Sequence, residues 1–266
     1  MFNKLIKIVF AVAVLFSLFF ILTGCSSKVE TKTTESSNSV NTTNSASNNE
    51  NAENDTNKER VVDTIDYKEA AEKQMAMPEK GDTIAIMHIK GYGDVKFKFF
   101  EEVAPKAVEN FLTHAKEGYY DGLTFHRIIN EFMIQGGDPE GTGMGGESIW
   151  GQGFGTELAY ELVPYRGSLC MAMSSLPNSI GSQFFITQAH YNESMSAYLK
   201  QGGYPEGLIE EYRKYGGYLS LYLQYTVFGQ VFEGMDVVDK VAAVKTDDND
   251  KPLENVIIES IEVTTY

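Results

Sequence analysis

The sequence is poor in cysteine and in basic side chains. It has two cysteines in 266 residues: Cys25 ends an apolar leader, and Cys170 lies in the apolar run SLCMAM. Two cysteines in such different settings argue against a disulfide framework, and we interpret Cys170 as a buried thiol without a catalytic role. The formal net charge of −15 at pH 7 argues against a nucleic acid or an anionic membrane bound through a basic surface. With 42% hydrophobic residues, the chain can form one substantial core.

Several familiar catalytic and metal-binding motifs are also missing. The four histidines form no HExxH motif, and no paired CxxC or close carboxylate cluster has metal-ligand spacing, so we predict neither a metal nor a cofactor. The glycine-rich stretch GDPEGTGMGGESIWGQG (137–153) lacks the GK[ST] ending of a phosphate-binding loop and is interpreted as an irregular surface loop. No serine stands in the GxSxG motif of serine hydrolases.

The first 24 residues have the pattern of a secretion signal. Lys4 and Lys7 precede the apolar run IVFAVAVLFSLFFIL, which leads into the tetrapeptide LTGC at 22–25. This tetrapeptide resembles the lipoprotein box of bacteria, which implies a signal peptide over 1–24 and lipidation of Cys25. A plain transmembrane anchor is the alternative, because the apolar run approaches the roughly 20 residues that span a bilayer. Both interpretations place the rest of the chain outside the membrane.

Residues 25–66 consist mainly of Ser, Asn, Thr and Glu and show no apolar periodicity. Such a segment cannot bury enough apolar surface to offset the conformational entropy lost on ordering, so we predict a disordered tether behind the lipidated cysteine. The length and composition of this tether favour the outer face of a Gram-positive cell membrane over a periplasmic location. Residues 67–266 then form one folded domain.

Strands dominate the prediction for residues 67–266. Short apolar runs separated by glycine-rich loops are typical of a closed antiparallel β-barrel. The run TIAIMHIKGYGDVKFKFF (83–100) predicts two strands joined by a turn, with Lys96 and Lys98 on the polar face of the second strand. The run NVIIESIEV (255–263) predicts a final strand that closes the sheet.

Helical spacing of apolar residues appears at a few places in the domain. It predicts helices over 105–117 and 235–244, and a short polar helix is expected over 67–75. Residues 188–219 do not fit a minimal barrel, and we interpret them as one inserted helix packed on the barrel, with a partner-binding element as the alternative. The predicted buried face of that helix consists of Leu208, Ile209, Tyr212 and Tyr215.

Five motifs resemble the cyclophilin family of peptidyl-prolyl cis-trans isomerases in order and spacing. They are FHRIINEFMIQGGD, GTGMGG, SLCMAM, PNSIGSQFFI and YTVFGQV. The resemblance extends over residues 83–263, nearly the whole predicted domain. It implies an all-β dominated fold in which an eight-stranded closed antiparallel barrel is capped by two α-helices, with an active groove on its outer surface.

The resemblance also assigns residues to that groove. Arg127 matches the catalytic arginine, and we place Gln135 and Phe185 with it in the catalytic set. Phe132, Met133, Phe185 and Leu221 match the pocket for the proline ring. Gln135 and Gln183 match the residues that hold the substrate backbone, and Ala172 and Met173 fall where the family pairs its own backbone with the peptide. The residues predicted to bind substrate are His126, Phe132, Met133, Ala172, Met173, Gln183, Leu221 and Tyr225.

Family membership implies catalysis of rotation about X-Pro bonds. Without catalysis this rotation takes about 10–100 s, which is slow enough to limit folding. We therefore predict an isomerase that accelerates the folding of exported polypeptides at the outer face of the cytoplasmic membrane. Its expected partners are unfolded or partly folded secreted chains with X-Pro bonds, with the membrane contacted through the lipid anchor only, no nucleic acid, and a monomeric state.

One segment departs from the family pattern. Many members have a W-L-D-G run before the strand that contains V-F-G, whereas this chain has Ser220, Leu221, Tyr222 and Leu223. A prolyl-peptide binding module or holdase without useful turnover is therefore the alternative function. A solute-binding lipoprotein of a transporter shares the leader but needs two α/β lobes, which the short antiparallel runs disfavour.

Overall fold

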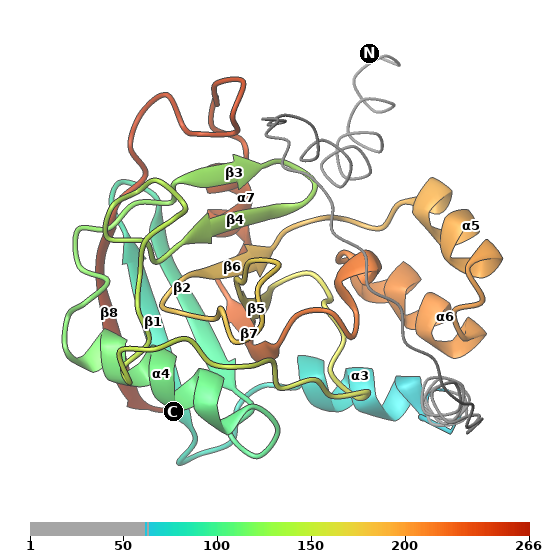
Figure 1. Cartoon of the computed structure of the whole chain (residues 1–266). Coiled ribbons are helices and arrows are strands. Elements are labelled where there is room, and N and C mark those ends of the chain that lie inside the picture. Colours follow the sequence, from blue (N-terminus) through green and yellow to red (C-terminus); the bar gives the residue numbers. More distant parts are fainter. Residues whose placement is uncertain (1–61, 63) are drawn as a thin grey trace, which may run out of the picture. The chain divides into compact units, whose positions relative to one another are not determined.

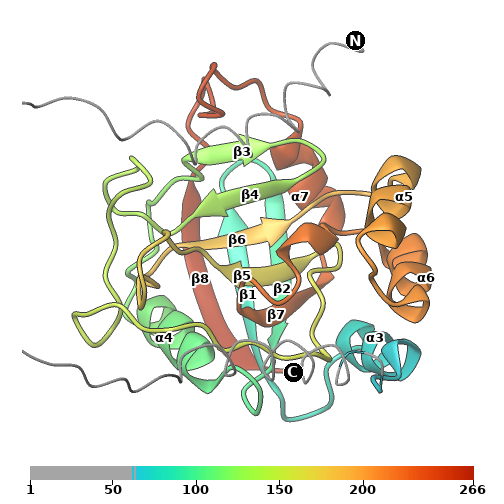
Figure 2. The same cartoon turned by 45° about the vertical axis from the view of Figure 1, so that its right-hand side comes forward.

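The computed structural model of the protein describes residues 62 and 64–266, which Figures 1 and 2 show from two directions. The predicted signal peptide, the lipidation site Cys25 and all but the last few residues of the predicted tether lie outside the described residues. None of the helices in the described part of the chain is both long and apolar enough to cross a bilayer.

Eight antiparallel strands form one sheet with the order β3-β4-β6-β5-β7-β2-β1-β8 (Figure 1). Alternating apolar residues pair across its strands: Ala85 lies opposite Phe97 and Met87 opposite Val95, and all four side chains are buried. The hairpin predicted over 83–100 is confirmed. The strands are β1 (Thr83–Ile89), β2 (Gly93–Phe99), β3 (Arg127–Ile129), β4 (Met133–Gly136), β5 (Ser168–Met171), β6 (Phe184–Thr187), β7 (Val227–Glu233) and β8 (Ile258–Thr265).

The sheet curls into a half-barrel, so the prediction of eight antiparallel strands is confirmed and the prediction of a closed barrel is not. The edge strands are β3 and β8, and in residues 62 and 64–266 no ladder pairs them. Thr124 and Ile257 form only an isolated bridge beside them. The outer edge of β3 is taken by a loop instead, because Ile128 N–H donates to the backbone oxygen of Asp250 at 2.8 Å.

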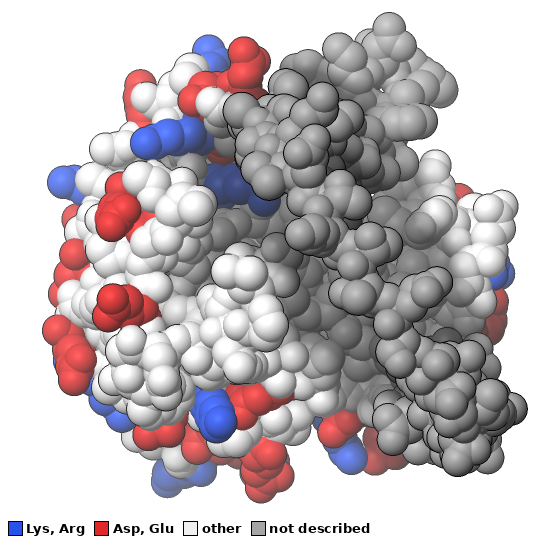
Figure 3. Space-filling model, in the orientation of Figure 1, with Lys and Arg blue, Asp and Glu red and all other residues white. Residues whose placement is uncertain are grey.

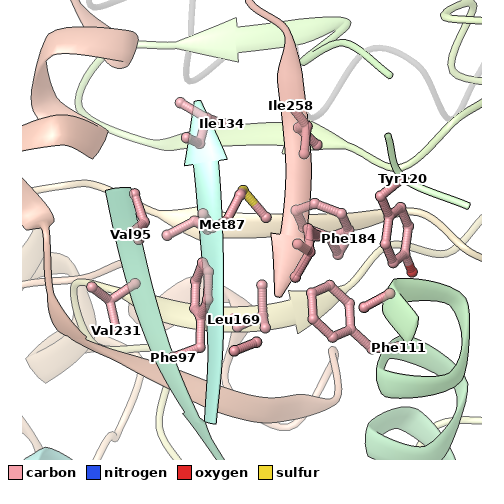
Figure 4. Close-up of a cluster of buried hydrophobic side chains, with 14 of the residues drawn as sticks. Met87, Val95, Phe97, Phe111, Tyr120, Ile134, Leu169, Phe184, Val231 and Ile258 are labelled. Carbon is pink, nitrogen blue, oxygen red and sulfur yellow. The ribbon is translucent and has the colours of Figure 1, made fainter. Parts of the chain in front are cut away.

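The two predicted capping helices are confirmed. Helix α4 (Pro105–Lys116) starts with proline in its first turn and packs against β7 and β8, while α7 (Met235–Ala242) packs against β2, β3 and β4. Between α4 and the sheet, Figure 4 shows the ring of Phe111 against those of Tyr120 and Phe184, with centroid distances of 5.2 and 5.3 Å. These aromatic contacts belong to the main core that supports the inner face of the sheet.

The predicted short helix α3 (Tyr67–Met75) lies against the outer face of the sheet. Its Gln74 side chain is buried and donates to Gln230 Oε1 at 3.1 Å and to Val163 O at 2.7 Å. Lys98, expected on a solvated face of β2, is only 8% exposed and donates to the backbone oxygen of Lys73 at 3.0 Å. Burial lowers the pKa of Lys98. Helix α3 therefore covers the face of β2 that was predicted to be polar from the alternation of apolar and charged residues.

The insertion contains two helices and not the single helix predicted. They are α5 (Glu193–Gln201) and α6 (Glu206–Tyr215), and a 3₁₀ turn, η1 (Leu219–Leu221), follows them. Asn192 starts α5 because its side chain accepts from Ser194 N–H at 2.9 Å. Figures 1 and 2 show α3, α5 and α6 together on one side of the sheet. The predicted apolar face of α6 is confirmed as buried or half-buried, in a second core shared with α3.

Candidate active site

The central row of predicted site residues is created by strand register. Arg127 on β3 lies opposite Gln135 on β4, Gln135 lies opposite Phe185 on β6, and Phe185 lies opposite Cys170 on β5. Because successive side chains alternate between the two faces of a strand, these four share the outer face of the sheet. Their neighbours in the chain, such as Ile128, point into the main core. The apolar inner face thereby determines which residues are presented outward.

A groove with a volume of about 470 Å³ lies over this row. It collects every predicted groove residue except Gln183. Figure 3 shows basic and acidic side chains close together in the upper part of the visible face near β3, with further acidic ones spread over the rest of that face. The lining consists of His126, Arg127, Phe132, Met133, Gln135, Gly141, Thr142, Gly143, Ala172, Met173, Phe185, Leu221, Tyr225, Asn249 and Lys251.

The apolar end of the groove is a pocket lined by aromatic rings. Phe185 and Tyr225 meet edge to face with their centroids 5.5 Å apart, and Phe132 packs on Tyr218 at 4.4 Å. Below them lies a third buried cluster that includes Met133, Cys170, Leu221 and Val227. Burial raises the pKa of the Cys170 thiol well above its ordinary value, which confirms it as a buried thiol.

Leu221 reaches the pocket although its segment departs from the family pattern. It ends the 3₁₀ turn η1, and its N–H donates to Tyr218 O at 3.0 Å. The next residue, Tyr222, turns away into the second core and donates to Tyr160 O at 2.7 Å. Trp150, the one tryptophan of the chain, contacts Phe154 and is not part of the groove lining.

Gln183 contacts the groove through Gln135. Gln135 Nε2 donates to Gln183 Oε1 at 2.9 Å, and Gln183 Nε2 donates to Gly145 O at 2.8 Å. The amide of Gln183 therefore orients that of Gln135, because its own acceptor and donor are both in use. In addition, Ala172 N–H donates to the backbone oxygen of Gln183 at 3.0 Å, which fixes the strand end that carries Ala172 and Met173.

His126 lies under the rim, and in the part of the chain that the structure describes neither of its ring nitrogens has a hydrogen-bond partner. It is 7% exposed, and a Cβ on Gly143 would lie 3.6 Å from its ring. Burial lowers the pKa of His126, and the nearby Asp138 carboxylate opposes this shift only in part. The imidazole is therefore neutral at pH 7 and contributes a polar atom without a charge.

Sequence reasoning missed two loops of the groove. The first contains Gly141, Thr142 and Gly143 and was interpreted as an irregular surface loop. It is organised by Asp138, whose carboxylate accepts from Glu140 N–H at 2.8 Å and from Gly143 N–H at 2.6 Å. An Asp followed by closely spaced glycines is a turn signal that could have indicated an ordered loop.

The second missed loop follows α7 and contributes Asn249 and Lys251 to the lining. Its Asp250 forms an ion pair with Arg127, with Nε and Oδ2 3.4 Å apart. The run TDDND contains strong turn formers. Nothing in the run, however, predicts that it lies against a strand more than a hundred residues earlier in the chain.

The fold and this groove define a peptide-binding isomerase of the cyclophilin class, and comparison with known proteins gives the family directly. Residues 84–263 match the family model described as cyclophilin type peptidyl-prolyl cis-trans isomerase/CLD. The chain therefore belongs to the cyclophilin-type peptidyl-prolyl cis-trans isomerases, and its enzymatic activity is that of this family.

Related sequences and structures agree with this assignment. A Staphylococcus aureus (strain USA300) protein named for peptidyl-prolyl cis-trans isomerase activity is 48% identical over 186 residues, which cover 70% of this chain and 93% of that protein. A Staphylococcus saprophyticus protein of the same name is 48% identical over 184 residues, covering 69% and 93%. A Cryptosporidium parvum cyclophilin, crystallised in the presence of the dipeptide Ala-Pro, has a TM-score of 0.56 at 35% identity and covers 69% of this chain and 99% of its own.

Proposed function

We propose that this isomerase accelerates the folding of exported polypeptides at the outer face of the cytoplasmic membrane, with Arg127 as its central catalytic residue. The observation that carries the catalytic part is the row of Arg127, Gln135 and Phe185 across three adjacent strands, beside an apolar pocket. The location rests on the sequence pattern of the leader and on Cys25.

Arg127 would act on the nitrogen of the proline ring. Rotation about the X-Pro bond has a barrier of roughly 18–20 kcal/mol, because resonance gives the C–N bond partial double-bond character. In the twisted transition state this nitrogen becomes pyramidal and regains its lone pair. A guanidinium N–H aimed at the lone pair stabilises the twisted state more than the planar ground state, and this difference lowers the barrier. Arginine suits the role because it remains charged at any physiological pH.

The rest of the groove would hold the two ends of the rotating bond. Phe132, Met133, Phe185 and Leu221 form the pocket that fits a proline ring. Gln135, oriented by Gln183, can donate to a backbone oxygen of the substrate. The ring stays in the apolar pocket while the preceding carbonyl rotates, so the reaction needs neither a covalent intermediate nor a cofactor.

The catalytic role of Arg127 is tested by protease-coupled isomerisation of a short Ala-Pro peptide. We expect Arg127→Ala to lower kcat/KM about 100-fold, the effect typical of removing one donor to a developing charge. The control is Arg213→Ala on α6, which removes an exposed arginine outside the groove lining and should leave the rate unchanged. Wild-type activity in the Arg127→Ala variant would refute the proposed role.

A prolyl-peptide binding module or holdase is the second candidate function, and the departure at residues 220–223 is the observation that favours it. Leu221 nevertheless lines the groove, which supports catalysis. Absence of turnover in the folded wild-type protein, together with binding of the peptide, would favour the module.

The proposed location is tested separately through Cys25. We expect labelled palmitate to be incorporated into the wild-type chain and not into Cys25→Ser. Cys170→Ser is the matched control because this thiol is buried in the folded domain, and it should keep the label. Equal labelling of the Cys25→Ser and wild-type chains would contradict lipidation at this position.

A further inference from the structure

The side chain of Arg127 is accompanied by a carboxylate from another part of the chain. Asp250 Oδ2 lies 3.4 Å from Arg127 Nε, and the two side chains are 41% and 44% exposed. A pair as exposed as this contributes little to stability, because water and salt screen it. Any importance of the contact must therefore lie in where it holds the guanidinium group.

The loop that carries Asp250 is internally ordered. Asp247 Oδ1 accepts from Asn249 N–H at 2.8 Å and from Lys251 N–H at 3.0 Å, and Asp247 N–H donates to Lys251 O at 2.8 Å. Asp250 itself has a φ of 65°, in the left-handed region that Asp and Asn adopt more readily than most residues. The loop thus presents this carboxylate in one defined orientation.

The same residue is attached to β3 by its backbone. Ile128 N–H, next to Arg127 in the chain, donates to Asp250 O at 2.8 Å. Because Ile128 is buried in the main core, this bond connects the loop to the most rigid part of the site. Asp250 therefore meets β3 twice, once through its backbone and once through its carboxylate.

The charged residues that line the groove indicate a second role for the carboxylate of Asp250. Among the described residues, the lining contains the cations Arg127 and Lys251 and no Asp or Glu side chain. Lys251 directly follows Asp250, and its charge reaches as far as His126. The carboxylate of Asp250 therefore offsets part of the repulsion that the guanidinium group of Arg127 experiences from Lys251.

We propose that Asp250 is a positioning residue that restrains the guanidinium plane of Arg127 from its Nε edge and aims the group at the substrate. Asp250 does not itself contact the substrate. The proposal rests on the proposed catalytic role of Arg127. It goes beyond that role by assigning part of the active site to the loop after α7, outside the strands and motifs that define the groove.

The first test is Asp250→Asn, assayed by protease-coupled isomerisation of an Ala-Pro peptide with the full chain. Asn tolerates the left-handed backbone and keeps the size of the side chain while removing its charge. We expect kcat/KM to fall about tenfold, mainly in kcat, because a small misorientation of a catalytic group weakens transition-state contacts more than ground-state binding. Asp248→Asn removes the same charge two residues earlier in the same loop and should leave kcat/KM unchanged. Equal activity of Asp250→Asn and Asp248→Asn would overturn the proposal.

The second test is a double-mutant cycle with Arg127→Lys. The lysine ammonium is a point charge with no guanidinium plane to orient, so adding Asp250→Asn to Arg127→Lys should cause no further loss. An equal loss in both backgrounds, or a loss explained by a lower Tm of Asp250→Asn, would show a structural role and overturn the proposal. Unchanged activity of Arg127→Ala would instead refute the proposed function, so the two failures are distinguishable.

Discussion

The two walls of the groove are built in different ways. Arg127, Gln135 and Phe185 stand on adjacent strands whose opposite face is packed in the main core. The other wall consists of three irregular segments, residues 141–143, 221–225 and 249–251. The strand wall is positioned by ladder hydrogen bonds and buried apolar side chains, whereas the loop wall is positioned by a few polar caps and ring contacts.

This difference predicts different consequences of substitution. Changes at the buried residues of the strand wall, such as Phe185, should lower both the free energy of unfolding and the rate of catalysis, because the same burial supports both. Changes in the loop wall should affect catalysis more than stability, since its anchors are few. Three experiments test this comparison, in order of decreasing expected effect.

The largest effect is expected for Phe185→Ala. The ring is buried in the cluster beneath the groove and meets Tyr225, so its loss should lower the free energy of unfolding by about 3 kcal/mol. It should also lower kcat/KM about tenfold, because a good ring contact contributes up to about 1.5 kcal/mol beyond burial. Urea unfolding and the coupled assay measure the two effects.

Phe232→Ala is the control for that experiment. Phe232 lies on β7, half-buried against Tyr266 and outside the groove lining. Loss of this ring should lower the free energy of unfolding by less than about 1.5 kcal/mol and leave kcat/KM unchanged. Equal effects of Phe185→Ala and Phe232→Ala on the free energy of unfolding and on kcat/KM would contradict the role of burial in positioning the strand wall.

An intermediate effect is expected for Tyr218→Ala, at a residue just before segment 221–225 of the loop wall. Tyr218 packs on Phe132 at 4.4 Å and is the point where the insertion meets the proline pocket. Removing the ring should raise KM about fivefold, equivalent to about 1 kcal/mol of substrate binding, with a smaller change in unfolding. Tyr198→Ala on α5, where the side chain is 64% exposed, is the matched control. A larger loss of stability than of binding would place Tyr218 with the strand wall instead.

The smallest effect concerns His126, which lies between the two walls. Burial lowers its pKa below the ordinary value of 6.5, so between these two pKa values the unfolded chain binds more protons than the folded protein. The free energy of unfolding should therefore fall as the pH drops below about 6.5 and level off below the folded pKa.

His126→Gln should reduce this loss of stability between pH 7.5 and pH 5.5, as measured by urea unfolding at each pH. Burial also lowers the pKa of His114, so His114→Gln should remove a separate part of the loss, and the double variant should remove both. Identical pH profiles for the wild type and His126→Gln would show that the ring is hydrated, and not buried, in solution.

Most of the strand wall could be predicted from the sequence, because its residues lie in two local motifs. FHRII with FMIQ supplies β3 and β4, and GSQFFI supplies β6. Period-two alternation then determines which side chains face outward once the strands pair. Leu221 and Tyr225 were reached only through the family pattern, and both line the groove.

Other features could not be predicted because they depend on contacts between distant segments. The single helix predicted in the insertion is two helices, since α5 buries few side chains and has a weak apolar stripe. The closed barrel was predicted from the pattern of short apolar runs between glycine-rich loops and from the family resemblance, but the edge of β3 binds the loop at Asp250. The polar face assigned to Lys98 is covered by α3, which precedes β1 in the chain.

The sequence by itself determined the family through its motifs, and local periodicity predicted the capping helices and several strands; the number of strands and the groove row of Arg127, Gln135 and Phe185 followed from the family resemblance. Only the tertiary structure decided that residues 141–143 and 249–251 complete the groove and that Asp250 accompanies Arg127. Such pairings depend on where irregular segments end in space, and a short loop carries no periodic pattern from which that position could be calculated.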